Sequence, residues 1–232
     1  MHAKFTNKNL QEYLAWDVQT WSGPLVYWQE LISKIDARQK LALELGANKG
    51  GLSLWLSRNG FECICSDYNS DLKNAKEHHS NSFGNISYQD LDASNLPFEN
   101  HFDIIVFKSV LGGVIRNNPE LLQKTFKSIY KALKPNGVLL FAENAKASIL
   151  HQLARRYFVS WGKSWKYLSY REMENNLGMF NEYEIRSTGF FTAFAPNHKI
   201  KSTVYSFDKV VSKLLPKSNR YVCFGMTKKT SK

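Results

Sequence analysis

The sequence predicts an α/β protein built on a doubly wound, mostly parallel sheet. Short apolar runs alternate with helix-like stretches from about residue 41 to residue 143, and turn residues separate them. This alternation is typical of strand–helix–strand units, whose strands pair in parallel. The length of 232 residues suits one domain, and 43% hydrophobic against 22% charged residues exclude wholesale disorder.

The elements of this core follow one another in order. We expect five strands, at residues 41–46, 61–66, 85–89, 102–107 and 138–143. The stretches between them predict helices at residues 52–58, 70–80 and 120–133, and Pro119 favours the start of the last one. The sequence Lys-Pro-Asn-Gly at residues 134–137 predicts a turn before the fifth strand.

The segments on either side of this core complete the predicted fold. Residues 1–40 predict a cap of two helices, which meet at the break Ser22-Gly23-Pro24 and pack on the sheet edge. Residues 146–232 predict an amphipathic basic helix at 149–165, a capped helix at 169–176, and an antiparallel strand pair at 182–189 and 221–228. The expected division is therefore 1–40, 41–145 and 146–232 within a single domain.

The positive charge is concentrated in the C-terminal third. The formal net charge is +11; residues 1–143 contain 15 basic and 15 acidic residues, and residues 144–232 contain 16 basic and 5 acidic residues. This asymmetry indicates either an anionic partner, such as nucleic acid, a phosphorylated substrate or a membrane surface, or a solvated basic face.

The apolar runs and the cysteines indicate the cellular compartment of the protein. No apolar run approaches the roughly 18 residues of a membrane-spanning helix, and the first residues lack the apolar region of a signal peptide. Cys63, Cys65 and Cys223 are odd in number and lack metal-ligand spacing, which argues against a disulfide framework and a zinc site. We expect a cytoplasmic protein without a metal.

The loop after the first strand predicts a ligand site. Gly46 and Gly50 allow a sharp turn and a close approach, and the next helix offers unpaired N–H groups. Asp67 ends the second strand, where a carboxylate accepts hydrogen bonds from ribose hydroxyls. These features indicate an adenosine-type cofactor. A nicotinamide dinucleotide fits less well, because Asn48 replaces the middle glycine of its fingerprint and Glu44 places negative charge near the pyrophosphate.

Four segments then carry a family resemblance. They are Glu44-x-Gly46-x-Asn48-x-Gly50, Leu-Asp-Ala-Ser-Asn-Leu-Pro-Phe at 91–98, the apolar run at 102–106, and Leu-Lys-Pro-Asn-Gly-Val-Leu at 133–139. In this order they resemble motif I, the adenine-contacting Asp-Ala-x-x-Leu-Pro-Phe segment, the fourth strand and the Leu-Lys-Pro-Gly-Gly turn of class I S-adenosylmethionine-dependent methyltransferases of the type 11 kind. The resemblance covers about residues 40–145. Asn48 departs from the family's central glycine, which affects the shape of the loop.

The resemblance implies both a topology and a cofactor site. The implied fold is a Rossmann-like seven-stranded sheet of order 3-2-1-4-5-7-6 with an antiparallel last strand, and the N-terminal residues cap the donor pocket. S-adenosylmethionine is the implied methyl donor, with its amino-acid end at Glu44, its ribose at Asp67 and its adenine at Asp92 and Ala93. The full set of implied cofactor contacts is Glu44, Gly46, Ala47, Asn48, Gly50, Asp67, Tyr68, Asp92, Ala93 and Lys108.

Little catalytic machinery is expected, because methyl transfer mainly needs alignment of the acceptor and, for a hydroxyl, its deprotonation. No Pro-Pro follows the fourth strand, which disfavours the amino-methyltransferases of nucleic acids, and no acid cluster there suggests a metal. Glu143, at the end of the fifth strand, and His151 are the candidate bases; their structural alternatives are a strand end or helix cap, and a surface histidine.

The aromatic and basic stretch at residues 155–167 is the candidate acceptor site. Its proposed contacts are Arg155, Arg156, Trp161 and Tyr167, because aromatic faces stack on rings or sugars and basic groups hold phosphate. A packing or membrane-surface helix, in peripheral contact with an anionic membrane, is the alternative. We expect the positive charge to gather at the acceptor entrance.

The expected activity is methylation of a small or medium anionic acceptor, with oxygen favoured and a nucleotide-linked or lipid-linked sugar as an example. An RNA methyltransferase is the alternative; a nicotinamide-dependent oxidoreductase or a non-catalytic cofactor-binding module is less favoured. Nucleic acid is thus an open but disfavoured partner.

Overall fold

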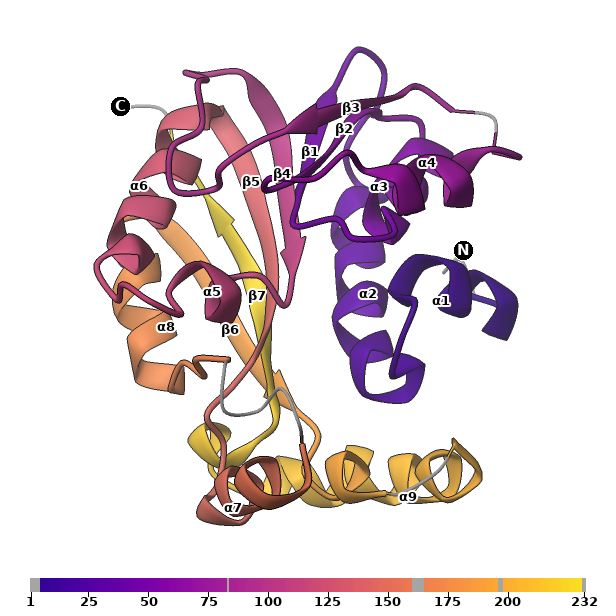
Figure 1. Cartoon of the computed structure of the whole chain (residues 1–232), viewed down its shortest axis with the longest axis vertical. Coiled ribbons are helices and arrows are strands. Elements are labelled where there is room, and N and C mark those ends of the chain that lie inside the picture. The colour runs from indigo at the N-terminus through magenta and orange to yellow at the C-terminus, as the bar shows by residue number, and fades with distance from the viewer. Residues whose placement is uncertain (1–4, 83, 160–164, 196–197, 231–232) are drawn as a thin grey trace.

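The computed structural model describes residues 5–82, 84–159, 165–195 and 198–230. Its centre is a seven-stranded sheet of order β3-β2-β1-β4-β5-β7-β6, as Figure 1 shows. β7 runs antiparallel to both of its neighbours, and the other strand pairs are parallel. The predicted fold class and strand order are confirmed. The strands are β1 (Leu41–Leu45), β2 (Glu62–Asp67), β3 (Ile86–Asp90), β4 (Phe102–Lys108), β5 (Leu133–Asn144), β6 (Glu182–Thr188) and β7 (Val222–Lys228).

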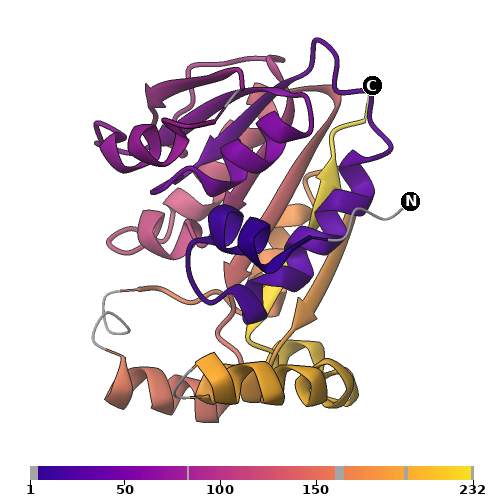
Figure 2. The same cartoon turned by 90° about the vertical axis from the view of Figure 1, so that its right-hand side faces the viewer.

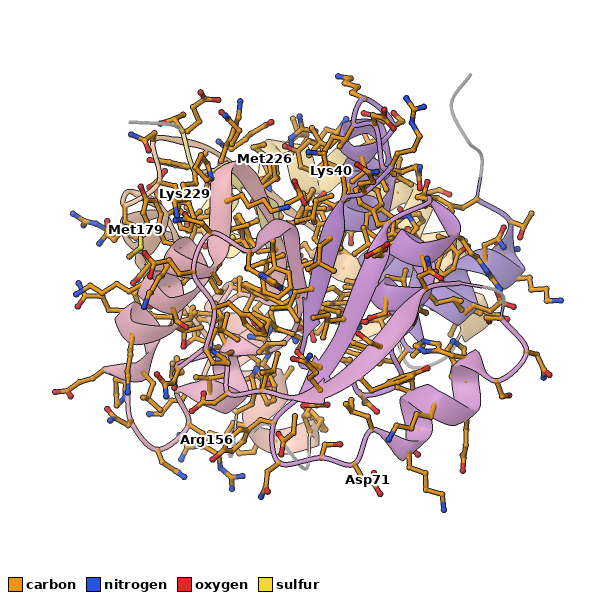
Figure 3. The ribbon with its side chains drawn as sticks, turned by 90° about the horizontal axis from the view of Figure 1, so that it is seen from above. Lys40, Asp71, Arg156, Met179, Met226 and Lys229 are labelled. Carbon is orange, nitrogen blue, oxygen red and sulfur yellow. The ribbon has the colours of Figure 1, made fainter. Side chains whose placement is uncertain are left out.

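Helices cover both faces of this sheet (Figures 1 and 2). Alternate residues of the central strands face opposite sides, so each face has its own apolar layer, and the side chains of both layers surround the sheet in Figure 3. α2 and α3 pack on one layer, and α6 and α8 on the other. The α-helices are α1 (Asn7–Leu14), α2 (Val18–Ile32), α3 (Gly51–Arg58), α4 (Lys73–His79), α5 (Leu111–Val114), α6 (Leu121–Ala132), α7 (Ile149–Phe158), α8 (Tyr170–Leu177) and α9 (His198–Val211).

The N-terminal helices differ from the prediction in two respects. The break lies at residues 15–17, where Ala15 and Asp17 have positive φ, and α2 continues through Pro24. α2 packs on the face of the sheet and not on its edge: the buried Trp28 donates its indole N–H to the Gly225 carbonyl at 3.1 Å. Proline inside a helix costs roughly 3 kcal/mol. Burial of Trp21, Leu25 and Trp28, at about 1.5–3 kcal/mol for a large apolar side chain, outweighs it.

The turn predicted before the fifth strand is retained as an irregularity within β5. The pairing with β4 passes from Phe102–Leu133 directly to Ile104–Val138, so residues 134–137 bulge out of the ladder. Asn136 has a φ of +65° there.

The second half adds α7, α8 and an insertion between β6 and β7. α8 is the predicted capped helix: the Ser169 side chain accepts from the Glu172 N–H, and the Glu172 carboxylate accepts from the Ser169 N–H. α7 ends at Phe158, earlier than predicted, and residues 160–164 lie outside the described ranges. The insertion between β6 and β7 contains α9 and three short 3₁₀ segments: η2 (Phe191–Phe194), η3 (Ser212–Leu214) and η4 (Lys217–Asn219).

α7 and α9 form one layer at the same end of the molecule in both views (Figures 1 and 2). Neither they nor any other helix among the described residues combines the length and apolarity that crossing a bilayer requires.

Candidate active site

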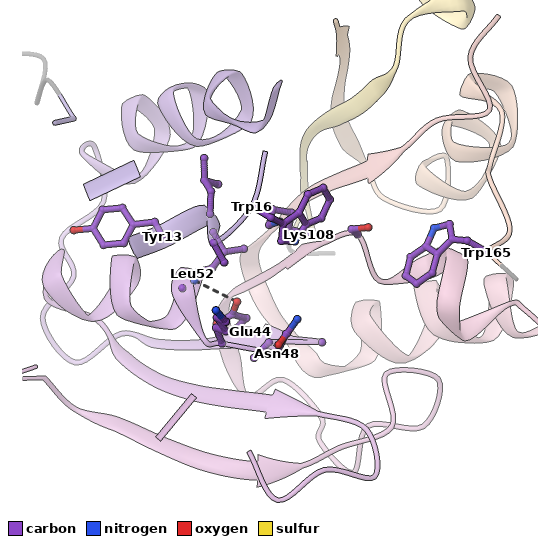
Figure 4. A pocket seen from close by; sticks show the side chains of 14 residues that line it. Tyr13, Trp16, Glu44, Asn48, Leu52, Lys108 and Trp165 are labelled. Carbon is purple, nitrogen blue, oxygen red and sulfur yellow. Dashed lines mark hydrogen bonds between the residues drawn. The ribbon is translucent and has the colours of Figure 1, made fainter. Parts of the chain in front are cut away.

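A cavity of about 540 Å³ opens at the carboxyl ends of β1 and β4 (Figure 4). The strand order changes direction between these two strands, and open α/β sheets bind ligands at such a switch point. Its volume is in the range of small-molecule sites. The lining residues are Tyr13, Leu14, Ala15, Trp16, Glu44, Gly46, Ala47, Asn48, Lys49, Gly51, Leu52, Lys108, Ser109 and Trp165.

The glycine loop forms one wall of this cavity. Gly46 has a φ of +62°, and a Cβ there would lie 2.5 Å from Cγ2 of Val110. Gly50 has a φ of +69°, and a Cβ there would lie 2.5 Å from Cε1 of His79. Both positions therefore require glycine for backbone conformation and for space. The tight loop brings β1 directly to the N-terminus of α3.

Glu44 lies at the end of β1 and is buried. Its carboxylate accepts hydrogen bonds from the Ser53 N–H and hydroxyl, both at 2.6 Å, and from the Leu52 N–H at 3.3 Å. These donors belong to the first turn of α3, where a negative charge is favourable. Burial nevertheless raises the pKa of Glu44 to about 7. Glu44 thus supplies a titratable carboxylate to the cavity (Figure 4).

Lys108, at the end of β4, brings a cation to the same cavity. Its ammonium nitrogen lies 3.8 Å from the centroid of the Trp16 ring and 4.7 Å from that of Trp21. The nitrogen is buried and has no hydrogen-bond partner among the described residues. Burial lowers the pKa of Lys108 to about 7, while the charge of Glu44 favours its protonated form. An orphaned buried ammonium of this kind fits an anionic ligand group.

Two further acids follow the neighbouring strands. Asp67 ends β2, and its carboxylate accepts the Asn48 N–H at 2.9 Å and the Tyr68 N–H at 2.8 Å. The chain after β3 passes beside it, because the Leu91 N–H donates to the Asp67 carbonyl. Asp92 then accepts the N–H and hydroxyl of Ser94, both at 2.8 Å.

Asp67 is therefore joined to the glycine loop through Asn48. Asp67, Tyr68, Asp92 and Ala93 lie outside the set that lines the cavity. Tyr68 is exposed, whereas Ala93 is buried.

Glu143 and His151 occupy positions away from the cavity lining. The buried Glu143 carboxylate accepts the N–H groups of Val110 and Leu111, both at 2.8 Å. It holds the loop that follows Lys108, and burial raises its pKa to about 7.

The buried His151 is held within the protein by both ring nitrogens: Nδ1 pairs with the Ser148 hydroxyl at 2.7 Å and Nε2 with the Phe190 carbonyl at 3.0 Å. Burial lowers its pKa to about 4. Neutral imidazole satisfies both partners, with Nδ1 as acceptor and Nε2–H as donor.

The candidate acceptor residues do not form one site. Arg155 is buried, donates to the carbonyls of Ala145 and Lys146, and stacks on Tyr167 at 3.9 Å. Arg156 is exposed and projects at the periphery in Figure 3. Neither arginine nor Tyr167 lines the cavity. Trp161 lies outside the described residues. Positive charge at the cavity comes from Lys49 and Lys108.

Three aromatic residues of the cavity wall were not among the predicted contacts, although Trp165 belongs to the predicted acceptor stretch at 155–167. Tyr13 and Trp16 come from the end of α1 and the turn after it, and Trp165 lies on the wall across from the glycine loop (Figure 4). The aromatic-rich N-terminus and the Trp-Lys-Tyr run at 165–167 were visible signals. An N-terminal cap over the donor pocket was predicted, but distance in sequence from the loop concealed which of these aromatic side chains enter the wall. Among the described residues, no group of three potential metal ligands occurs.

An open parallel sheet with a glycine loop, an acid at the end of the next strand and a cavity at the switch point defines the class of nucleotide-cofactor-binding α/β proteins. Comparisons with known proteins narrow this class. Residues 43–141 match a family model described as a methyltransferase domain. A ubiquinone/menaquinone biosynthesis C-methyltransferase, UbiE, of Pectobacterium carotovorum is 35% identical over 127 residues, which are 52% of this chain and 48% of that protein.

Solved structures agree on the fold. Phosphoethanolamine N-methyltransferase 2 of Haemonchus contortus, in complex with S-adenosyl-L-methionine, gives a TM-score of 0.64 at 16% identity over 99% of this chain and 58% of that chain. A SAM-dependent methyltransferase of Methanosarcina mazei gives 0.61 at 17% identity over 87% and 98%. Residues 43–141 thus form a methyltransferase domain, similar to those of S-adenosylmethionine-dependent methyltransferases. The chain spans about half the length of the curated relatives it matches.

Proposed function

We propose that this chain transfers a methyl group from S-adenosylmethionine to a small or medium-sized acceptor. The observation that carries the proposal is the pairing of Glu44 and Lys108 in one cavity beside the glycine loop. The amino-acid part of the donor is a zwitterion, and a buried carboxylate with a buried ammonium offers it both complementary charges.

The proposed donor contacts lie first in the cavity and then at the ends of the neighbouring strands. Glu44 receives the ammonium group and Lys108 the carboxylate, which gives the orphaned lysine nitrogen its missing partner. The backbone of residues 46–50 allows close approach. Asp67 and Tyr68 are the proposed ribose contacts, and Asp92 and Ala93 the proposed adenine contacts; the Asp67 oxygens each keep acceptor capacity beside their present N–H partners.

The sulfonium of the donor makes the transfer an in-line displacement, for which the protein mainly has to align the acceptor. We propose Trp16 and Trp165 as acceptor contacts, because they line the cavity outside the glycine loop (Figure 4). Glu143 accepts two backbone N–H groups, so its proposed contribution is to hold the loop carrying Lys108. His151 is proposed to stabilise the fold, since both its nitrogens are bonded internally.

Oxygen is the proposed methylated atom, and an amphipathic anionic molecule such as a lipid-linked sugar the proposed acceptor. The relatives are named for methylation of carbon and of nitrogen. Methyl release from the donor across acceptor classes, with the product atom identified by NMR, tests this: a carbon or nitrogen product overturns the oxygen assignment. Methylation of structured RNA alone overturns the small-molecule proposal.

Calorimetry separates the cofactor alternatives. We expect binding of S-adenosylhomocysteine and none of NAD; the reverse result refutes the methyltransferase proposal. Cys63, Cys65 and Cys223 are all free and buried, which supports the cytoplasm as the proposed compartment.

A further inference from the structure

The end of the molecule formed by α7, η2, α9 and η3 exposes many large apolar side chains. Phe158 is 85% exposed, Leu214 82% and Ile149 74%. A gathering of this kind on one end of a protein indicates an interaction surface. We call it the apolar face; its residues are Ile149, Leu150, Leu153, Tyr157, Phe158, Phe191, Phe194, Ile200, Phe207, Val210 and Leu214.

The two helices of this face have inverted amphipathicity. The side chains that α7 buries include His151 and Arg155, which donate to or pair with backbone carbonyls, while its apolar residues point outward. α9 likewise buries Asp208, whose carboxylate accepts the N–H groups of Phe190 and Thr192. A helix that packs on a protein core normally does the opposite.

The outward residues also share the periodicity of helix faces. In α7, residues 149, 153 and 157 are four apart; in the α9 segment, residues 200, 207 and 214 are seven apart. Contacts through η2 join the two segments. The ring centroids of Phe194 and of His151 in α7 lie 4.4 Å apart, and those of Phe191 and of Phe207 in α9 lie 5.8 Å apart. The helices that carry the apolar face therefore lie in one layer (Figures 1 and 2).

Positive charge accompanies the apolar residues. Residues 149–158 and 190–220 together contain eight lysines and arginines and one acidic residue, Asp208, which is buried. Arg156, Lys209 and Lys213 are exposed and adjacent in sequence to Tyr157, Val210 and Leu214. The acceptor cavity thus does not account for this part of the net charge of +11.

We propose that the apolar face binds the surface of an anionic lipid bilayer. Apolar side chains enter the boundary between headgroups and acyl chains, and flanking cations attract anionic headgroups. A second copy of this chain fits less well, because both copies would bring exposed lysines and arginines to the contact and would repel one another.

An ion pair links α9, which carries part of the apolar face, to the cavity wall. Lys201 of α9 forms an ion pair with Asp17 at 2.6 Å, next to Trp16 in the cavity wall. A bilayer-bound enzyme would therefore hold its cavity near the lipid surface, which, given the proposed function, favours an amphipathic acceptor embedded in the membrane.

Cosedimentation of the full chain with vesicles tests this proposal without donor or acceptor, so its outcome is independent of the methyltransferase proposal. We expect binding to vesicles containing about one third phosphatidylglycerol, weaker binding to phosphatidylcholine alone, and weakening by salt. The double variant Lys209→Glu, Lys213→Glu should bind at least about 25-fold more weakly, from roughly fivefold for each lysine charge lost near the surface. The matched control is Lys124→Glu, Lys127→Glu on α6, which is also exposed.

The apolar contribution has its own control. Phe207→Ser with Leu214→Ser should reduce vesicle binding at least tenfold, whereas Val26→Ser with Tyr183→Ser, exposed residues elsewhere, should leave it unchanged. Circular dichroism and melting curves check that all variants fold. If each double variant binds vesicles as tightly as its matched control, or if the wild type does not bind anionic vesicles, the proposal is overturned. Concentration-dependent dimers that Phe207→Ser with Leu214→Ser abolishes would assign the face to a second copy instead.

Discussion

The ammonium nitrogen of Lys108 lies 3.8 Å from the centroid of the Trp16 ring, buried and without a hydrogen-bond partner among the described residues. The ring supplies some of the solvation that water would give, and burial still lowers the pKa of the lysine to about 7. A fold that keeps such a group sacrifices stability at this site, which is expected where a ligand supplies the missing partner.

Replacing this lysine should therefore increase the stability of the protein and weaken its binding of the cofactor. Lys108→Met should raise the melting temperature, because a buried unpaired cation is removed at similar volume. The same variant should bind S-adenosylhomocysteine about 10- to 100-fold more weakly, the range for a charged hydrogen bond. Lys49→Met, an exposed lysine of the same cavity, is the control for both measurements. Unchanged affinity in Lys108→Met would exclude a contact with the donor carboxylate.

Donor binding should also weaken in acid. Glu44 has a pKa raised to about 7 by burial, so it loses its charge as the pH falls through 7 and can no longer complement the donor ammonium. Lys108, whose pKa is also about 7, gains its charge over the same range and opposes this loss, so calorimetry between about pH 8 and pH 6 should show the falling affinity in a Lys108→Met background. In that background, Glu44→Gln should bind more weakly at pH 8 and lack this acid limb. An identical limb in the variant would assign it to another group.

Gly46 should be irreplaceable for two separable reasons. Gly46→Ala introduces a Cβ 2.5 Å from Cγ2 of Val110 and also strains a backbone with a φ of +62°. We expect a loss of about 2–4 kcal/mol in the free energy of unfolding. Adding Val110→Ala removes the clash and leaves the strain, so denaturant unfolding of the double variant should show less penalty from the alanine at 46. No such recovery would mean that strain alone requires glycine.

His151 should make the protein less stable in acid. Its pKa is lowered to about 4 in the folded state from an ordinary value near 6.5, so the unfolded chain binds the proton first. Stability contributed by neutral His151 is therefore lost as the pH falls from about 6.5 to about 4. His151→Gln should show a smaller fall in unfolding free energy across this window than wild type. His101→Gln, on an exposed histidine, should keep the wild-type slope.

The adjacent residues Arg155 and Arg156 should differ in their contribution to the free energy of unfolding. Arg155 is buried and donates to two backbone carbonyls, and Arg155→Ala should cost about 2–3 kcal/mol of unfolding free energy by leaving them unpaired. Arg156→Ala changes an exposed side chain and should stay within about 0.5 kcal/mol. Similar costs for the two variants would contradict the burial of Arg155. Chemical denaturation measures both.

Local sequence patterns were sufficient to predict the sheet and the glycine loop. Apolar runs such as residues 102–107 are strand-length and lie between helical patterns, and parallel connection of such runs leaves few topologies. A sharp turn and a strand end depend on neighbours in sequence, so local patterns were enough to identify Gly46, Gly50 and Asp67. These features were therefore predictable in position and in type.

Which side chains come into contact depends on the folded chain. Trp16 and Trp165 share a cavity wall with Glu44, although they are far from it along the chain. Consecutive helix residues point about 100° apart, so the sequence showed that Arg155 and Arg156 face different directions but not which one faces inward. Burial of Arg155, His151 and Asp208 depends on carbonyl and N–H groups of distant loops. No local pattern reports the position of those partners, and so the inverted amphipathicity of α7 and α9 appears only in the folded chain.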